Sequence, residues 1–375
     1  MAYPQDDSRI GTVVRDAILD WKRPIDLGPD TKVKDYRRYT KRKWLFTLAC
    51  AIITFLVMGV ALTIGDSPIT VIDVYNTIWH HITGNVVNVH DDYVIITLRM
   101  PRVIIGLFAG AGLAACGAVM QSIMMNPLTD TYTTGVSSGA MFGVTLAMAM
   151  GFSVTSGQLG LVINAFVFAL IPTAVILMVS GIRNVSPTVM VMAGIAVMYL
   201  FNALTTVMKL WATESTLSDI YVWSVGSLSL AGWPAVPTLI AVVIPGILLM
   251  MLMSRQINVL TTGDENATAM GINATNLRRI LLALMALIAA TIVSFTGLIG
   301  FVGLIVPHVC RMFLGADNRF IIPASAMFGA MMLVLSDLVG RVIIYPTVLQ
   351  VGVITSFLGG PMFLWLILRK KNRVW

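Results

Sequence analysis

Residues 103–124 read VIIGLFAGAGLAACGAVMQSIM and contain no charged side chain. A helix needs about 20 consecutive apolar residues to cross the hydrocarbon core of a bilayer, so this stretch is long enough to span a membrane. Gly106, Gly110, Gly112 and Gly117 fall within it. Small residues let helix backbones approach closely in lipid, where no hydrophobic force drives helices together. The stretch therefore predicts a transmembrane helix in a tightly packed bundle rather than an isolated anchor.

The rest of the chain has the same character. Of its 375 residues 57% are hydrophobic and only 11% are charged, whereas a soluble domain carries about 25% charged residues. So few charges cannot cover an apolar globule in water, which excludes an ordinary soluble enzyme, a disordered protein and a nucleic-acid binder. We predict an all-α membrane protein with about ten transmembrane helices. The expected spans are 44–65, 103–124, 135–151, 157–180, 188–210, 234–254, 280–298, 301–314, 321–343 and 349–368.

The basic residues predict the orientation of these spans. Residues 1–43 hold 11 Lys and Arg against 7 Asp, and residues 369–375 hold four basic residues and no acid. With ten spans, the segments on the side of the two termini carry 21 of the 25 Lys and Arg. This split follows the positive-inside rule and predicts a multi-pass protein of the cell membrane with both termini cytoplasmic. We expect a cytoplasmic extension at 1–43, a membrane domain at 44–370 and a cytoplasmic tail at 371–375.

Three arginines fall on the predicted outer side. Arg99 and Arg102 are at the mouth of the second span, and Arg341 is near the outer end of the ninth. Such arginines can simply reach the lipid headgroups, or they can form a positive docking surface for an acidic partner outside the membrane. Asp337 precedes Arg341 by one helical turn, so an i,i+4 pair could absorb that charge.

Catalytic and metal-binding patterns are absent from the sequence. It has no His-Glu-x-x-His, no Gly-x-Ser-x-Gly, and no P-loop, because it lacks even a Gly-Lys dipeptide. We therefore expect neither an enzyme nor a metal site. Scarce ionisable groups inside the spans argue against an ion-coupled secondary carrier, which stays an alternative together with a non-transport scaffold. Cys50, Cys116 and Cys310 are scattered in apolar stretches and form no disulfide framework.

Two further features each allow two interpretations. His80, His81 and His90 lie in the external loop 66–98, either as solvated residues or as a haem or metal contact. Methionines near the fifth span either serve packing or line an adaptable conduit. The candidate lining residues are Met190, Met192, Met198 and Met208.

The longest internal polar loop is 255–279. Asp264 and Glu265 follow Thr262-Gly263, a pattern typical of a short capped helix, which Gly271 would end. A short helix between two spans can be a mere connector, or it can be a lever onto which another subunit docks.

From about residue 45 to 370 the chain resembles the FecCD-type permeases. These are membrane subunits of ABC importers for iron–siderophores, haem and cobalamin. The resemblance rests on separate blocks that occur in the family's order. The blocks are Leu98-Arg99-Met100-Pro101-Arg102, Gly117-Ala118-Val119-Met120-Gln121, Asn126-Pro127-Leu128-Thr129-Asp130, Gly135-Val136-Ser137-Ser138-Gly139-Ala140, Gly263 to Gly271, Gly300 to His308, Val351-Gly352-Val353-Ile354-Thr355 and Gly359-Gly360-Pro361.

The resemblance implies a cobalamin-importer-like permease bundle. It also implies a translocation channel formed with a second permease subunit, which is either another copy of this chain or a paralogue. It implies a separate ATPase dimer that holds ATP and Mg²⁺, an extracytoplasmic substrate-binding protein, and no cofactor or covalent chemistry in this chain. It places the docking of the binding protein at Arg99, Arg102 and Arg341. The implied ATPase-docking residues are Gly263, Asp264, Glu265, Ala267 and Gly271, and the implied channel and gate residues are Asn126, Ser186, Thr188, Met190, Met198 and Thr355.

The chain departs from the family pattern at a few positions. Thr131 and Thr133 replace a usual Pro and an apolar residue, Asp264 stands where Glu is commoner, and Gln350 replaces a usual Pro. These changes leave the identity of the cargo open.

Overall fold

The computed structural model describes residues 31–368, apart from 66, 68 and 183–185. The chain forms two compact units, residues 1–45 and 46–375. The described part of the first unit is the beginning of helix α2 (Thr31–Thr63), and all later helices belong to the second. The described residues form helices and turns without any strand, which confirms the all-α prediction. Residues 1–30 and the predicted tail 371–375 lie outside the described part, so those two boundaries stay predictions.

Each of the ten predicted spans coincides with a helix. Within the described residues, seven helical stretches are long and apolar enough to cross a membrane, and α6, α14 and α16 are shorter apolar helices. The prediction of a multi-pass membrane protein is therefore confirmed. The helices that match the spans are α2, α5 (Met100–Ile123), α6 (Val136–Met150), α7 (Gln158–Ile182), α8 (Pro187–Lys209), α10 (Ala235–Leu252), α13 (Ala274–Thr296), α14 (Val302–Leu314), α15 (Asn318–Val342) and α16 (Val351–Leu368).

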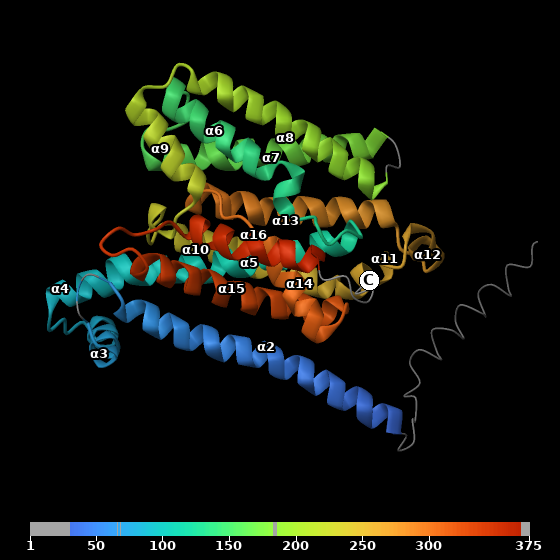
Figure 1. Ribbon diagram of the computed structural model, residues 1–375, viewed down its shortest axis with the longest axis horizontal. Coiled ribbons are helices and arrows are strands. Elements are labelled where there is room, and N and C mark those ends of the chain that lie inside the picture. Colours follow the sequence, from blue (N-terminus) through green and yellow to red (C-terminus); the bar gives the residue numbers. More distant parts are fainter. Residues whose placement is uncertain (1–30, 66, 68, 183–185, 369–375) are drawn as a thin grey trace, which may run out of the picture. The chain divides into compact units, whose positions relative to one another are not determined.

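Short helices connect the spans, and one of them, α12, matches the short helix predicted after Gly263. In Figure 1, α3 and α4 lie at one end of the helix bundle and α11 and α12 at the other. Local sequence explains where they begin: Thr70 and Asp73, for example, form a capping box at the start of α3. The short elements are α3 (Val71–Ile82), α4 (Val89–Asp92), the π-helix η1 (Tyr93–Arg99), the 3-10 helix η2 (Thr131–Thr134), α9 (Glu214–Val225), the 3-10 helix η3 (Leu228–Leu230), α11 (Ser254–Leu260) and α12 (Asp264–Ala269).

Helix α5 is the most enclosed helix and packs against α15, α14, α10 and α13. Glycines face each other where it crosses two of them. A Cβ on Gly110 would lie 2.3 Å from the Gly329 carbonyl oxygen, and a Cβ on Gly117 would lie 1.8 Å from that of Gly303. The close packing that the glycines of residues 103–124 predict is thus confirmed.

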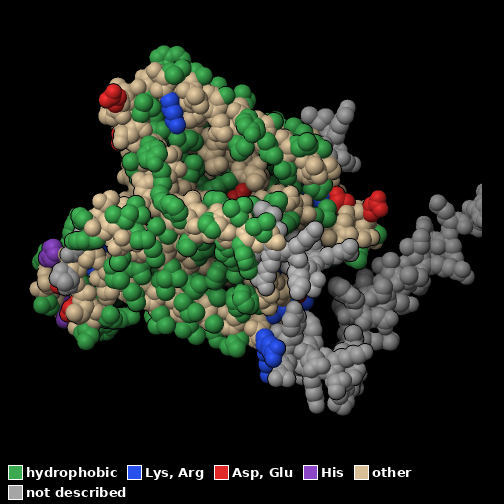
Figure 2. All heavy atoms as spheres, in the orientation of Figure 1, with side chains coloured by type: hydrophobic (Ala, Val, Ile, Leu, Met, Phe, Trp, Pro, Cys, Tyr) green, Lys and Arg blue, Asp and Glu red, His purple; other side chains and the backbone are tan. Residues whose placement is uncertain are grey.

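Helix α13 joins two groups of helices. Its buried residues belong both to a core shared with α5, α10, α14 and α15 and to a second core shared with α6, α7 and α9. Figure 1 shows α13 between these groups. Hydrophobic side chains cover much of the face visible in Figure 2. Large apolar side chains that are exposed include Phe55, Leu248 and Phe357. An apolar outer face of this kind is what a lipid solvent requires.

Candidate docking ends and channel face

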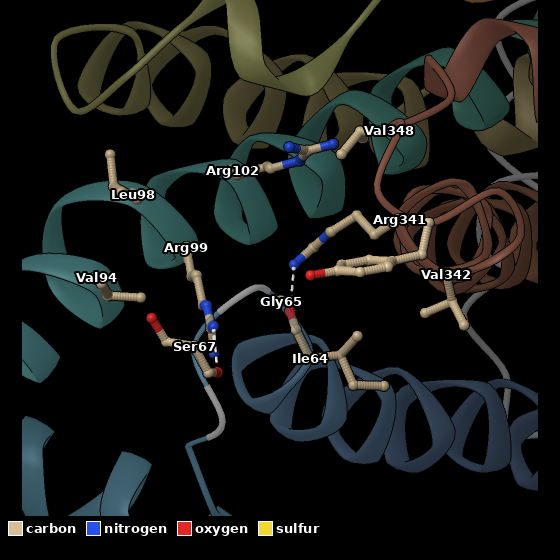
Figure 3. A pocket seen from close by; sticks show the side chains of 11 residues that line it. Ile64, Gly65, Ser67, Val94, Leu98, Arg99, Arg102, Arg341, Val342 and Val348 are labelled. Atoms are coloured by element: carbon tan, nitrogen blue, oxygen red, sulfur yellow. Dashed lines mark hydrogen bonds between the residues drawn. The ribbon is translucent and has the colours of Figure 1, made fainter.

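The three predicted arginines converge at one end of the bundle, which we call the arginine end. Arg99 and Arg102 come from the junction of η1 and α5, and Arg341 comes from the last turn of α15. Together with the residues after α2 they line a cavity of about 400 Å³, shown in Figure 3. The sequence therefore identified a real cluster, although it could not show that the members touch one pocket.

Asp337 joins two of these arginines. Arg341 donates to its carboxylate from Nε at 2.9 Å and from Nη2 at 2.5 Å, which confirms the predicted i,i+4 pair. Arg102 donates to the same carboxylate from Nε at 3.0 Å and from Nη2 at 2.8 Å. The Asp337 side chain is only 1% exposed, so its charge depends on these two guanidinium groups for compensation. Nothing in the sequence signalled the contact with Arg102.

Arg99 and Arg341 also hold the end of α2. Arg99 donates from Nη1 to the carbonyl oxygens of Leu62 and Thr63 at 2.8 and 2.9 Å, and from Nη2 to that of Ser67 at 3.0 Å. Arg341 Nη1 donates to the carbonyl oxygen of Ala61 at 2.9 Å. The last carbonyls of a helix lack partners within it, and cations there also interact favourably with the helix dipole. These two arginines therefore have a structural task in the bundle.

The opposite end of α5, the α12 end, carries the predicted ATPase-docking segment. α5 is about 36 Å long at 1.5 Å per residue, so the two ends are separated by about the thickness of a membrane. Arg278 of α13 is 1% exposed, and its Nε donates at 2.9 Å to the carbonyl oxygen of Ile123, the last residue of α5. Its Nη1 and Nη2 donate to the two carboxylate oxygens of Asp264, the first residue of α12, at 2.6 and 2.5 Å. This contact lowers the pKa of Asp264.

Of the five predicted docking residues, some are exposed to a partner and others attach α12 to the bundle. Glu265 and Gly271 are exposed, whereas Ala267 is fully buried and packs into the main core. Asp264 is turned toward Arg278. Gly263 and Gly271 flank α12 with φ of 109° and 79°, a backbone conformation that other residues rarely adopt. Glu265 therefore offers the exposed charge of this helix, while Asp264 and Ala267 hold the helix on the bundle.

The predicted channel and gate residues are not gathered in one place. Ser186 is the N-cap of α8, and Thr188 is exposed on its first turn. Met190 is 2% exposed and packs in the main core, and Thr355 is fully buried and donates to the carbonyl oxygen of Gly352. Met198 is partly buried in α8, and the side-chain oxygen of Asn126 accepts from the backbone N–H of Leu128. A channel role for these residues stays a prediction.

A depression of about 540 Å³ lies where the end of α9, the link before α14 and the helix α16 meet. Gly300, on this link, has no atom within 4 Å of the place where a Cβ would be, so the depression is open there. Three of the quoted blocks contribute residues to it: Gly300 to His308, Val351 to Thr355 and Gly359 to Pro361. Its lining residues are Ser224, Val225, Leu298, Gly300, Gly352, Val353, Ser356, Phe357 and Pro361.

The three histidines that the sequence predicts to be external lie on the short helices α3 and α4. His81 Nδ1 is 2.8 Å from Asp92 Oδ1, and Ser67 is 3.3 Å from a ring nitrogen of His90. Across the described ranges no three His, Cys, Asp or Glu side chains lie close enough together to hold a metal ion.

Known proteins resemble this chain along most of its length. MJ0087 of Methanocaldococcus jannaschii, assigned as an ABC transporter permease protein, is 39% identical over 90% of this chain and 98% of its own. The hemin transport system permease protein HmuU of Yersinia pestis is 33% identical over 85% of this chain and 95% of its own. A solved structure described as an inward-facing conformation of a metal-chelate type ABC transporter matches with a TM-score of 0.77 and 27% identity, over 86% of this chain and 98% of that one. Because the family model of the FecCD transport family also matches residues 51–369, the chain belongs to that family.

Proposed function

We propose that this permease works between two partners, a separate ATP-binding dimer at the α12 end and a substrate-binding protein at the arginine end. The observation that carries the proposal is the placement of two charged surfaces at opposite ends of α5. One offers Glu265 on a short helix that is anchored by Arg278, and the other offers the arginine cluster. Electrostatic complementarity of this kind selects and steers partners.

The proposal includes the orientation and the cargo. The α12 end faces the cytoplasm with both termini, and the arginine end faces outward, in agreement with the 21-to-4 distribution of basic residues. A second copy of the chain completes the channel, and lipid surrounds the pair. The cargo is a metal chelate, an iron–siderophore, haem or cobalamin, since one relative is named for hemin and the solved structure for a metal chelate.

The mechanism is alternating access driven from outside the chain. ATP and Mg²⁺ are held by the partner dimer, whose closure displaces α12, and the bundles rock about their contacts. The depression beside α16 supplies a wall for the passing cargo, which needs no tight binding because recognition resides in the binding protein. This chain binds no cofactor and forms no covalent bond with the cargo.

The test measures ATP hydrolysis by the purified ATP-binding subunit, with and without this chain in lipid nanodiscs. We expect the chain to stimulate hydrolysis and Glu265→Arg to remove the stimulation. Glu214→Arg on α9 is the matched control, because Glu214 is the only other glutamate of the chain and is also exposed. Equal stimulation by both variants would exclude docking at α12. Uptake that needs an ion gradient but no ATP would instead favour the secondary carrier.

A further inference from the structure

A groove of about 420 Å³ lies between α2 and α10. Side chains of α5 and α15 form its floor, where Ala111, Ala326 and Ala330 are buried. Phe55 on α2 and Leu248 on α10 also line the groove and are exposed, so it is open to the surroundings of the bundle. The lining residues are Ala51, Thr54, Phe55, Met58, Leu107, Phe108, Ala111, Val243, Ile244, Ile247, Leu248, Met251, Pro323, Ala326, Met327 and Ala330.

The groove is apolar along its whole length. Thr54 is the single polar residue among the described residues that line it, and its hydroxyl donates to the carbonyl oxygen of Cys50 at 2.7 Å. The same hydroxyl lies 3.3 Å from the carbonyl oxygen of Met327, where α2 meets α15, and Figure 1 shows these two helices next to each other. A polar ligand would lose hydrogen bonds in such a groove, whereas a hydrocarbon chain would supply the dispersion contacts that an empty groove lacks.

The groove lies in the half of the membrane at the α12 end. It begins near Pro323, in the second turn of α15, and near Met251, the last residue but one of α10. The stretch of α15 from Pro323 to Ala330 is about 10 Å long at 1.5 Å per residue. The hydrocarbon core of a bilayer is about 30 Å thick, so one leaflet contributes about 15 Å. The length of the groove therefore suits one acyl chain of that leaflet.

Two exposed arginines lie beyond the apolar lining at this end of the groove. Arg319 precedes Pro323 by four residues on α15 and so lies on the same side of that helix. Arg255, on α11, follows Met251 by four residues. Both arginines are therefore at the level where lipid headgroups replace hydrocarbon.

α11 and the start of α15 are held together at this place. Nδ2 of Asn258 donates to Asp317 at 2.7 Å, and the side-chain oxygen of Asn258 accepts from the backbone N–H of Asn318 at 2.8 Å. Arg255 lies one turn before Asn258 on α11, and Arg319 binds Asp317 through Nη2 at 2.6 Å. Two arginines against one aspartate leave an excess of positive charge beside the opening of the groove.

We propose that this groove binds an anionic phospholipid of the leaflet at the α12 end. One acyl chain lies in the groove between α2 and α10, and the phosphate binds Arg255 and Arg319. Basic pockets between transmembrane helices suit anionic headgroups, and guanidinium groups match the geometry of a phosphate. The lipid fills the space between α2 and the rest of the bundle and so stabilises the position of α2. The inference does not depend on docking of an ATP-binding subunit at α12.

The experiment measures lipid binding to the full chain in detergent by native mass spectrometry. The protein is titrated with phosphatidylglycerol or with phosphatidylcholine that carries the same acyl chains. We expect one phosphatidylglycerol to be retained more tightly than any phosphatidylcholine. Arg255→Gln and Arg319→Gln should each weaken the binding of phosphatidylglycerol about five-fold and leave that of phosphatidylcholine unchanged. Lys209→Gln, near the end of α8, is the matched control and should change neither.

A second pair of variants tests the acyl chain. Ala51 lines the groove from α2 and is only partly buried, so Ala51→Phe places a ring in the groove and should reduce the binding of both lipids. Ala241→Phe is the matched control, because Ala241 is exposed on α10 and does not line the groove. Ala51→Leu makes a smaller addition at the same place and serves if the phenylalanine variant does not fold.

Three results would overturn the proposal. Equal lipid binding by the Ala51 variants and Ala241→Phe would show that no acyl chain occupies the groove. Equal affinity of the wild-type chain for the two lipids would exclude a headgroup site at Arg255 and Arg319. A stable dimer that retains no lipid would show that a second copy of the chain covers the groove instead.

Discussion

Arg102 and Asp337 lie 235 residues apart in the chain but form a bidentate ion pair, with Nη2 2.8 Å from Oδ1 and Nε within 3.1 Å of both carboxylate oxygens. The same carboxylate also binds Arg341, so one buried negative charge holds the start of α5 and the end of α15 together. With two arginines to one aspartate, this group retains a net positive charge. This group of three side chains therefore links α5 to α15 and also gives a positive potential at the surface of the bundle.

We expect Asp337→Asn to destabilise the protein markedly. The substitution leaves the buried guanidinium group of Arg341 and the partly buried one of Arg102 without their counter-charge. Removal of one partner of a buried pair costs about 3–5 kcal/mol. Thermal unfolding in detergent should show a clearly lower midpoint. Asp219→Asn is the control, because Asp219 is exposed and no ion pair is found for it in the described part of the chain. Equal midpoints for the two variants would show that the pair contributes nothing to stability.

Arg102 is expected to be the arginine that an acidic partner engages first. Its side chain is 16% exposed, against 7% for Arg341, and no hydrogen bond from its Nη1 is found within the described residues. Arg102→Gln should therefore weaken binding of the proposed substrate-binding protein and make that binding less sensitive to salt. Surface plasmon resonance over a range of ionic strengths measures both effects, with Lys209→Gln as control. An unchanged salt dependence would contradict this role.

The crossing of α5 and α14 should not tolerate one added methyl group. In Gly117→Ala the new Cβ would be 1.8 Å from the backbone oxygen of Gly303, so the helices must separate. Overpacking usually costs about 1–3 kcal/mol, and a clash with backbone lies at the upper end of that range. Gly360→Ala is the control, since nothing lies within 4 Å of its added Cβ. The yield of monodisperse protein and the unfolding midpoint should fall only for Gly117→Ala.

The Asp264–Arg278 pair should make the stability of the α12 end depend on pH. The pKa of Asp264 is lowered, chiefly by the hydrogen bonds from Arg278, so the folded state favours the ionised form. The resulting stabilisation is present above the ordinary pKa of an aspartate, about 3.9, and is lost as the pH falls through the lower pKa of the folded state. Unfolding midpoints of wild type and Asp264→Asn should therefore converge below about pH 4. A constant difference between them down to the lowest pH would contradict the assignment.

Much of the architecture was predictable from the order of the residues alone. An apolar stretch such as residues 103–124 must leave water whatever its neighbours are, so its length predicts a span. All ten predicted spans became helices, and the Asp337–Arg341 pair followed from the spacing of one helical turn. The glycines of α5 likewise predicted close packing. A glycine has no side chain to keep a neighbouring helix away, and this can be recognised from the sequence alone.

Only the tertiary structure decided which distant groups meet. Arg102 and Asp337, Arg278 and Ile123, and Arg279 and Ser180 are pairs with no local spacing that could reveal them. The same holds for Ala267 and Met190, which the sequence placed at a docking surface and a channel and which the packing buries in the core. Burial and long-range ion pairs depend on how helices cross, and that depends on all their contacts at once. The lengths of the apolar stretches therefore predicted the helices, while the packing of α5 against its neighbours decided which charged side chains are buried in ion pairs and which remain exposed.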